Sequence, residues 1–257
     1  MGYLRLRQIC LVARALEPAV GDLANILGLA VCHRDGNVAK YGLVNALLPV
    51  GASFLEVVAP TRDGTAAGRY LERRGGDGGY MVILDCDDIE RRRSQMVAIG
   101  VRIVNPLTYE TYTGLQLHPR DTGGTMLEFN HTTGGESLDG PYHPAGPDWR
   151  AALRTDVTAG LLAAVIQSAD PAGLARRWGD IVERPVSRNG ADEPQILLDL
   201  GMLRFVLDRD QRGEGLGGVD VLAPNPERII EIAAARGYPA ERDTVTLCGV
   251  RFRLVGA

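Results

Sequence analysis

The stretch Gly51-Ala52-Ser53-Phe54-Leu55-Glu56 has a near-repeat later in the chain, Gly124-Thr125-Met126-Leu127-Glu128. Each stretch closes a segment that opens with an apolar, strand-like run. The first run starts at Gln8, 48 positions before Glu56, and the second starts at Met81, 47 positions before Glu128. A matched spacing between a strand start and a carboxylate indicates a duplicated structural unit. It also predicts that the two glutamates occupy equivalent places in their repeats.

The first repeat covers about residues 4–60. Residues 6–13 predict a strand, and residues 16–27 predict a helix because their apolar side chains recur on one helical face. Gly28 suits the end of that helix, since glycine adopts the left-handed conformation found there. Three further strand-like stretches follow, and together they give the order β-α-β-β-β: residues 30–33, 41–48 and 53–59.

The second repeat, about residues 78–130, has the same order. Residues 80–85 predict a strand, Asp87-Asp88 offers a helix N-cap, and residues 89–99 predict the helix. A hairpin of residues 114–118 and 125–130 then closes the repeat around a turn rich in proline, aspartate and glycine.

The remaining sequence predicts two more, weaker repeats after a boundary. Residues 134–157 are rich in glycine and proline and form a predicted linker. We therefore predict an N-terminal pair of repeats in residues 1–133 and a degenerate C-terminal pair in residues 158–257. The expected fold class is α+β, with four βαβββ units forming two paired, cupped mixed β-sheets with flanking helices.

Composition restricts the partners and the compartment. The 257 residues are 45% hydrophobic and 23% charged with a net charge of −4, which is ordinary for a globular protein. No long basic run favours nucleic acid, and no apolar stretch is long enough to predict a membrane span. The four cysteines form no CxxC pair, so we expect reduced core cysteines and a cytoplasmic protein. Four repeats could pair within one chain, so a monomer is expected to be viable, and a homodimer remains the alternative.

The pattern resembles the vicinal oxygen chelate superfamily, which is also called the glyoxalase/bleomycin-resistance/dioxygenase fold. The resemblance is carried by Arg7-Gln8-Ile9-Cys10-Leu11-Val12-Ala13 and by the two closing strands that end in Glu56 and Glu128. The stretch Leu117-His118-Pro119-Arg120-Asp121-Thr122-Gly123-Gly124-Thr125-Met126-Leu127-Glu128 is similar to the corresponding hairpin of methylmalonyl-CoA epimerases.

The resemblance implies a cup whose metal ligands come from the first and last strands of each repeat. It places Gln8, Glu56, Met81 and Glu128 at the four ligand positions. The three oxygen donors Gln8, Glu56 and Glu128 suit a divalent ion such as Mg, Mn, Fe, Ni or Zn. Met81 is a soft thioether ligand and a poor partner for these ions, and the superfamily usually has histidine there.

Four further side chains are candidate substrate contacts. His118 precedes the hairpin turn, and its structural alternative is to stabilise that turn. His131 lies three residues after Glu128, and an odd offset places two side chains on opposite faces of a strand. Tyr142 and His143 lie in the linker, which would deliver them to a substrate only if it folds over the cup.

Three functions remain open. The first is a lyase, isomerase or epimerase in which Glu56 or Glu128 moves a proton next to the carbonyl of a small oxygenated substrate, with or without a metal. The second is a non-catalytic protein that binds or sequesters a small molecule, which Met81 favours. The third, an extradiol dioxygenase, fits the four-repeat length but not the ligands, since Fe(II) oxygenases use two histidines and one carboxylate.

Overall fold

The computed structural model describes residues 2–256, and these residues separate into two compact units. Unit 1 contains the chain up to Gln8, Tyr80–His143 and Ala163–Leu216. Unit 2 contains Ile9–Gly79, Pro144–Leu162 and Gly217–Ala257. The second predicted repeat therefore shares unit 1 with most of the third, and the first shares unit 2 with most of the fourth.

One sheet of unit 1 contains the second repeat. Its strand order is β1-β4-β7-β6-β5, where only the first half of β1 (Leu4–Val12) belongs to this unit. The strand β4 (Gly78–Cys86) pairs in parallel with β7 (Met126–Thr132), which pairs antiparallel with β6 (Tyr112–Leu117). The edge strand β5 (Ile103–Tyr109) forms a hairpin with β6. Helix α3 (Ile89–Ala98) starts where the Asp88 carboxylate accepts a hydrogen bond from the Arg91 N–H.

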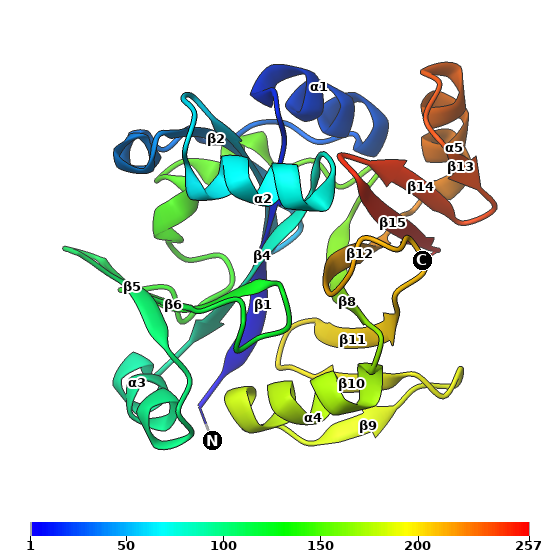
Figure 1. Cartoon of the computed structure of the whole chain (residues 1–257). Helices are drawn as coiled ribbons and strands as arrows, with labels where there is room; N and C mark the ends of the chain where they lie inside the picture. The colour runs from blue at the N-terminus through cyan, green and yellow to red at the C-terminus, as the bar shows by residue number, and fades with distance from the viewer. Residues whose placement is uncertain (1, 257) are drawn as a thin grey trace. The chain divides into compact units, whose positions relative to one another are not determined.

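The third repeat supplies the other sheet of unit 1, in the order β8-β11-β10-β9. The strand β8 (Gly160–Ser168) pairs in parallel with β11 (Met202–Leu207), followed by the antiparallel strands β10 (Pro194–Leu197) and β9 (Val186–Arg188). Helix α4 (Pro171–Val182) contacts β10 and β11, as Figure 1 shows. Trp178 of this helix is fully buried and packs edge-on against Phe205, so α4 is fixed by its apolar face.

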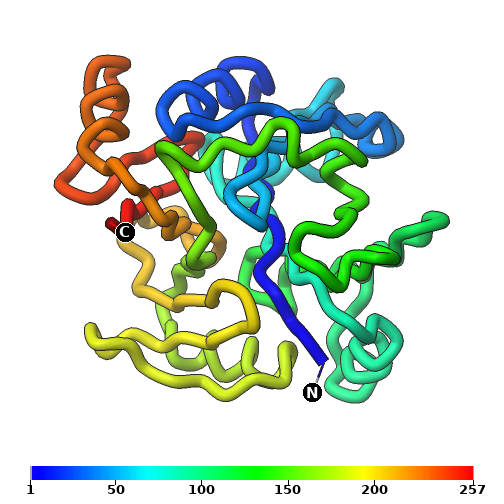
Figure 2. Tube along the Cα trace, turned by 180° about the vertical axis from the view of Figure 1, so that it is seen from behind, coloured from blue at the N-terminus to red at the C-terminus, as the bar shows by residue number. Residues whose placement is uncertain are grey.

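Unit 2 contains the first and fourth repeats. Its strands follow the orders β2-β3-β1 and β13-β14-β15-β12-β8. Helices α1, α2 and α5 also lie in this unit, and Figure 2 shows α5 beside the hairpin of β14 and β15. The element bounds are Leu16–Leu27 for α1, Leu43–Val50 for β2, Ser53–Pro60 for β3, Ala66–Arg74 for α2, Gly215–Leu222 for β12, Pro226–Ala235 for α5, Ala240–Glu241 for β13, Thr244–Leu247 for β14 and Val250–Val255 for β15.

Short 3-10 helices complete the described chain. They are Gly36–Tyr41, His143–Ala145 and Trp149–Ala152. The ring of Trp149 packs edge-on against Phe54 of β3, 5.1 Å between ring centres. Part of the predicted linker is thus held against the core of unit 2.

The α+β prediction is confirmed, because mixed sheets and helices follow the expected repeat order. The predicted strand at residues 30–33 is wrong: only a bridge between His33 and Leu47 forms there. Helix α2 was not expected, and Thr65 caps it by accepting from the Gly68 N–H. The assignment of residues 1–133 and 158–257 to separate domains stays a prediction.

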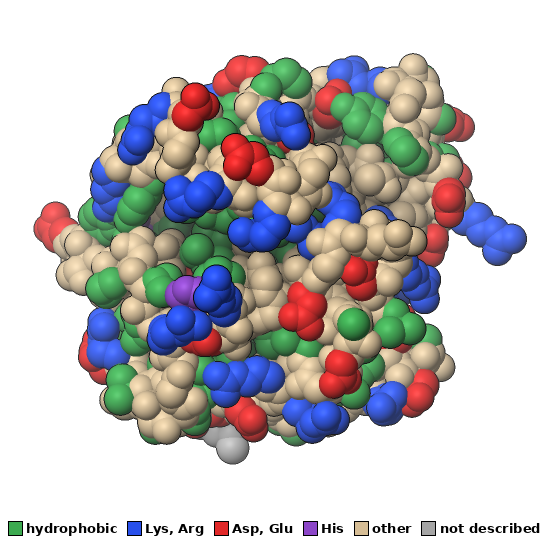
Figure 3. Space-filling view, viewed as in Figure 1, with side chains coloured by type: hydrophobic (Ala, Val, Ile, Leu, Met, Phe, Trp, Pro, Cys, Tyr) green, Lys and Arg blue, Asp and Glu red, His purple; other side chains and the backbone are tan. Residues whose placement is uncertain are grey.

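Figure 3 shows basic and acidic side chains interspersed on the face it displays. Within residues 2–256, every helix is too short or too polar to cross a membrane. The four cysteines are free, and Cys10 and Cys86 are buried.

Candidate functional site

A polar face lies on the β4, β7 and β6 strands of unit 1. Strand register pairs Ile83 with Glu128 and Asp85 with Asn130. It also pairs Glu128 with Gln116 on β6. Side chains in register on neighbouring strands share a face, and a strand returns to the same face every second residue. Glu128, Asn130, Gln116 and Asp85 therefore lie on one face of the sheet.

Glu128 is the centre of this face. Its side chain is only 2% exposed. One carboxylate oxygen accepts a short hydrogen bond from the Tyr112 hydroxyl, and the other accepts from the Gln116 amide at 2.8 Å. Gln116 is itself held by the Asn105 amide, 2.8 Å from its carbonyl oxygen. A buried carboxylate needs such donors, because burying an unpartnered charge is costly.

Gly114 leaves space for the side chains of Glu128 and Tyr112 to meet. A Cβ atom at Gly114 would lie 3.1 Å from the Glu128 Oε1 and 3.1 Å from a ring carbon of Tyr112. Gly114 is the residue between Tyr112 and Gln116 on the same face of β6. The missing side chain therefore lets the tyrosine reach the carboxylate across the strand.

A second chain of hydrogen bonds runs beside the first. The Asn130 amide donates to the Tyr142 hydroxyl at 3.1 Å, and that hydroxyl donates to the Gln8 carbonyl oxygen at 2.9 Å. Gln8 is 2% exposed and Tyr142 is also 2% exposed. We call six residues of these two chains the Glu128 cluster: Gln8, Tyr112, Gln116, Glu128, Asn130 and Tyr142.

Both tyrosines of the cluster stay protonated. Burial is the main cause that raises the pKa of Tyr112 well above its usual value, and the negative charge of Glu128 adds to it. Burial likewise raises the pKa of Tyr142, although its hydrogen bond with Asn130 acts in the opposite direction. The cluster therefore presents neutral hydroxyl groups, which are hydrogen-bond donors, beside a carboxylate.

His143 closes one side of this arrangement. Its ring stacks on Tyr112, 5.2 Å between ring centres, and on Tyr109 at 5.4 Å. Its Nδ1 lies 3.0 Å from the Thr111 hydroxyl, and its backbone N–H donates to the Thr132 hydroxyl. The linker thus places both Tyr142 and His143 at the cluster, which the sequence left conditional on how it folds.

Asp85 is the member of the face that sequence reasoning missed. It is 2% exposed, and burial raises its pKa to about 6 despite the opposing charges of Arg7 and Arg5. Arg5 approaches it at 3.5 Å. The sequence held a signal for it, because Asp85 ends the same apolar run that begins at Met81. Only the strand register shows that it shares a face with Glu128.

The other predicted histidines lie outside the cluster. His118 accepts a hydrogen bond from the Arg120 N–H at 3.1 Å, so it stabilises the turn. His131 lies 3.0 Å from the Cys86 carbonyl oxygen through its Nδ1. As its odd offset from Glu128 predicted, it is on the other face of β7. Neither contact brings an imidazole to Glu128.

Glu56 has a similar environment in unit 2. It is 7% exposed on β3, and the Asn45 amide of β2 donates to its Oε1 at 2.7 Å. The other side of the Asn45 amide, its carbonyl oxygen, accepts from the Asp35 N–H at 2.8 Å. Glu56 and Glu128 are thus both buried, and each accepts a hydrogen bond from a side-chain amide on the preceding strand. The participation of both glutamates in one site stays a prediction.

The described residues fit a hard divalent cation poorly. No group of three or more His, Cys, Asp and Glu side chains among residues 2–256 is arranged to hold a metal ion. Met81 shares the face with Glu128, and a thioether is a soft ligand. The carboxylate oxygens of Glu128 already accept from Tyr112 and Gln116. A metal held by Gln8, Glu56 and Glu128 stays a prediction that this donor chemistry does not favour.

The arginines of the C-terminal half serve structural ion pairs. Arg204 pairs with Glu193, 2.5 Å between nitrogen and oxygen, and Arg253 pairs with Asp220 through two nitrogens. Both arginines thus neutralise carboxylates of the C-terminal half.

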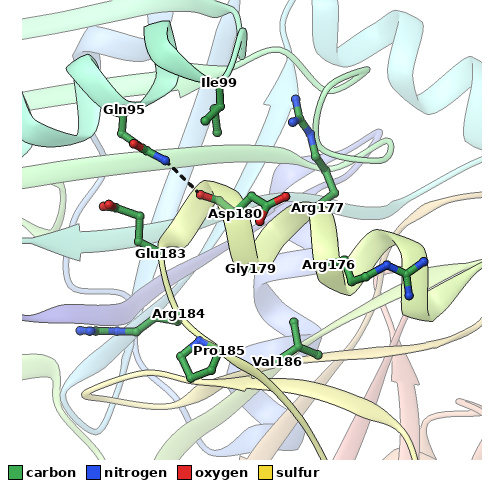
Figure 4. Close-up of a pocket in the computed structure, with 10 residues that line it drawn as sticks. All are labelled: Gln95, Ile99, Arg176, Arg177, Gly179, Asp180, Glu183, Arg184, Pro185 and Val186. Atoms are coloured by element: carbon green, nitrogen blue, oxygen red, sulfur yellow. Dashed lines mark hydrogen bonds between the residues drawn. The ribbon is translucent and has the colours of Figure 1, made fainter.

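A groove of about 710 Å³ in unit 1 lies elsewhere and shares no lining residue with the Glu128 cluster. It is formed by α3 and by α4 with the chain that follows it. In Figure 4 the side chains of Arg176, Arg177 and Arg184 point in different directions rather than converging on one ligand. The Gln95 amide donates to the Asp180 carbonyl oxygen at 3.4 Å across it. Among the described residues, the groove therefore brings no set of charged side chains together, whereas a carboxylate and its donors converge in the Glu128 cluster.

Comparison with known proteins agrees with this fold. A mitochondrial methylmalonyl-CoA epimerase from Dictyostelium discoideum is 21% identical over 131 residues, which are 50% of this chain and 78% of that protein. A hypothetical protein from Staphylococcus aureus matches over 99% of both chains with a TM-score of 0.69 and 11% identity, which shows the fold alone.

A variant methylmalonyl-CoA epimerase from Streptomyces coelicolor matches 52% of this chain and 99% of its own length. Its identity is 24% and its TM-score of 0.48 is too low to support an argument. The model of the glyoxalase-like domain family matches residues 9–182, well over half of the chain. The chain belongs to the glyoxalase-like domain family.

Proposed function

We propose that the protein is an isomerase or epimerase that binds a small oxygenated carbonyl compound at the Glu128 cluster. Glu128 removes a proton from the carbon next to the carbonyl, and a proton delivered by a second acid to the opposite face of the resulting enolate inverts that carbon. The observation that carries this proposal is the buried Glu128 carboxylate, 2% exposed and fixed by Tyr112 and Gln116. A general base must be positioned within reach of the proton that it takes, and two donors on separate atoms supply that positioning.

The neighbours of Glu128 provide the complementary chemistry. Removing a proton next to a carbonyl places negative charge on the carbonyl oxygen, which hydrogen-bond donors stabilise. The Asn130 amide is such a donor, because Asn130 lies on the same face of the sheet as Glu128. The low exposure of the cluster excludes water, which strengthens these interactions.

The relatives suggest a first substrate to test. The Dictyostelium discoideum relative is named a methylmalonyl-CoA epimerase, and epimerisation of such a thioester exchanges a proton next to a carbonyl. This chemistry matches what a fixed carboxylate beside neutral donors can perform. Glu56 enters the proposal as a second carboxylate because of its equivalent place in the first repeat. No step depends on a metal.

The test is solvent proton exchange. The protein is incubated in D₂O with methylmalonyl-CoA and with a panel of small 2-hydroxy and 2-oxo carbonyl compounds, and deuterium at the carbon next to the carbonyl is measured by mass spectrometry. We expect exchange with wild-type protein and a loss of at least about 100-fold in Glu128→Gln, since general-base catalysis contributes about 10² to 10⁴. Glu214→Gln is the matched control, because Glu214 bonds to Ser168 outside the cluster. Equal rates in both variants would contradict the role of Glu128.

A non-catalytic binding protein is the second candidate. It is favoured by the two protein donors that already hold the Glu128 carboxylate and by Met81 at a predicted ligand position. The same panel separates the two functions. Tight binding of a compound that never exchanges its proton supports the binder. Exchange lost in Glu128→Gln supports the enzyme. The extradiol dioxygenase has no such support, since His118 and His131 both lie away from Glu128.

A further inference from the structure

Residues 134–143 form a segment of unit 1 that we call the strap. It follows the end of β7 and contains three glycines and a proline. Two turns shape it, closed by the Gly135 N–H to the Thr132 carbonyl oxygen and by the Gly140 N–H to the Ser137 carbonyl oxygen, both at 2.9 Å. The strap has no strand or helix of its own before His143. Its position therefore depends on contacts made with neighbouring elements.

Two arginine side chains of β1 donate hydrogen bonds to backbone carbonyl oxygens of the strap. Arg5 donates to the Glu136 carbonyl oxygen at 2.7 Å and to the Gly135 carbonyl oxygen at 3.4 Å. Arg7 donates to the Leu138 carbonyl oxygen at 2.9 Å. Arg7 is 1% exposed, and its guanidinium carbon lies 5.3 Å from the centre of the Tyr142 ring. Hydrogen bonds from charged donors are stronger than neutral ones, so these contacts dominate the attachment.

The strap carries Tyr142 into the Glu128 cluster. The Tyr142 hydroxyl accepts from the Asn130 amide and donates to the Gln8 carbonyl oxygen. One oxygen atom thus satisfies a buried donor and a buried acceptor at once. A hydroxyl or enol oxygen of a ligand has the same two capacities, whereas a ketone oxygen only accepts.

We propose that the strap is an autoinhibitory gate, in which the Tyr142 hydroxyl occupies the place of a ligand hydroxyl or enol oxygen between Gln8 and Asn130. Arg5 and Arg7 hold the gate closed, and its release exposes that place to a ligand. Only the identity of the incoming group rests on the proposed function. The opening of the strap can be measured without any substrate, so the two proposals fail separately.

The test is amide hydrogen exchange of the full-length protein, read by mass spectrometry on peptides that cover the strap and β7. In wild-type protein we expect the strap amides to exchange faster than those of β7. Arg5→Gln removes the bonds to the Gly135 and Glu136 carbonyl oxygens. It should speed exchange in the strap by about tenfold or more and leave β7 unchanged, given the strength of charged hydrogen bonds.

Arg93→Gln is the matched control, because Arg93 is a helix arginine of the same unit whose partner is Glu90 on its own helix. It should leave strap exchange unchanged. Arg5→Lys should recover part of the wild-type protection, since lysine restores a charged donor. Tyr142→Phe removes the hydroxyl alone and should also speed strap exchange, which keeps the test open if Arg5→Gln does not fold. Strap exchange equal to wild type in Arg5→Gln or Tyr142→Phe, or an equal rise in β7, would overturn the gate.

Discussion

Replacing Asp85 with asparagine should change how stability depends on pH. The folded protein holds the pKa of Asp85 at about 6, against 3.8 in the unfolded chain, because burial disfavours the charged form. Each pKa unit corresponds to about 1.4 kcal/mol. The free energy of unfolding should therefore change by about 3 kcal/mol between a pH at which Asp85 is protonated in both states and a pH at which it is ionised in both. The raised pKa means that the folded state binds the proton more tightly than the unfolded state. The stabilising contribution of Asp85 to the free energy of unfolding is therefore fully present below pH 4 and is lost as pH rises through 6.

The assay is urea unfolding from pH 4 to pH 7, followed by the fluorescence of the buried Trp178 in unit 1. Because other carboxyl groups also titrate, the informative quantity is the wild-type free energy of unfolding minus that of Asp85→Asn. This difference should fall by about 3 kcal/mol between pH 4 and pH 7. Asp139→Asn changes an exposed carboxylate of the strap and should show no such fall. A constant difference for Asp85→Asn would refute the assignment of a buried, hard-to-ionise carboxyl.

Three further outcomes are expected. Gly114→Ala should destabilise the protein by about 1–3 kcal/mol, because the new Cβ atom would crowd Glu128 and Tyr112. It should also lower the rate of substrate proton exchange. Urea unfolding measures the first effect, and the D₂O exchange assay measures the second. Arg92→Ala should cost about 1–3 kcal/mol, since Arg92 is 5% exposed and donates to the Val182 carbonyl oxygen and to Glu183, while Glu183 keeps Arg91 as a partner; urea unfolding showing a loss below about 0.5 kcal/mol would contradict it. Treatment with EDTA should leave proton exchange unchanged, and loss of exchange restored by an added divalent ion would show that a metal takes part.

Repetition in the sequence was sufficient to predict much of the fold. The spacing of apolar residues predicted helix α1 at residues 16–27, where the structure has it, and Asp88 was correctly expected to cap α3. The alternation of side chains along a strand also predicted that His131, three residues after Glu128, lies on the opposite face. These features depend on local periodicity and capping, which a sequence displays directly.

The partners of Glu128 could not be predicted, because they depend on register between strands distant in sequence. Tyr112 and Asp85 reach the same face as Glu128 through the pairing of β6 and β4 with β7. No local pattern marks Tyr112, and the end of the apolar run that marks Asp85 does not show which face of the sheet it shares. The strap was expected only as a linker, since a stretch rich in glycine and proline does not reveal which carbonyl oxygens Arg5 will bind.

The grouping into compact units was also beyond the sequence. Similarity between repeats predicted pairs of consecutive repeats, and that division into domains stays a prediction. The compact units contain most of the second repeat with most of the third, and most of the first with the fourth. Which repeats pack together depends on the contacts of buried side chains across long sequence separations. Periodicity within each repeat carries no such information.

The most direct measurement follows one pure enantiomer of a compound that the panel identifies, in D₂O, and records optical activity and mass together. We expect wild-type protein to remove the optical activity while one deuterium enters at the carbon next to the carbonyl. Glu128→Gln should bind the compound but neither remove the optical activity nor introduce deuterium. Optical activity lost at the wild-type rate in Glu128→Gln, or lost without deuterium, would contradict proton transfer by this carboxylate.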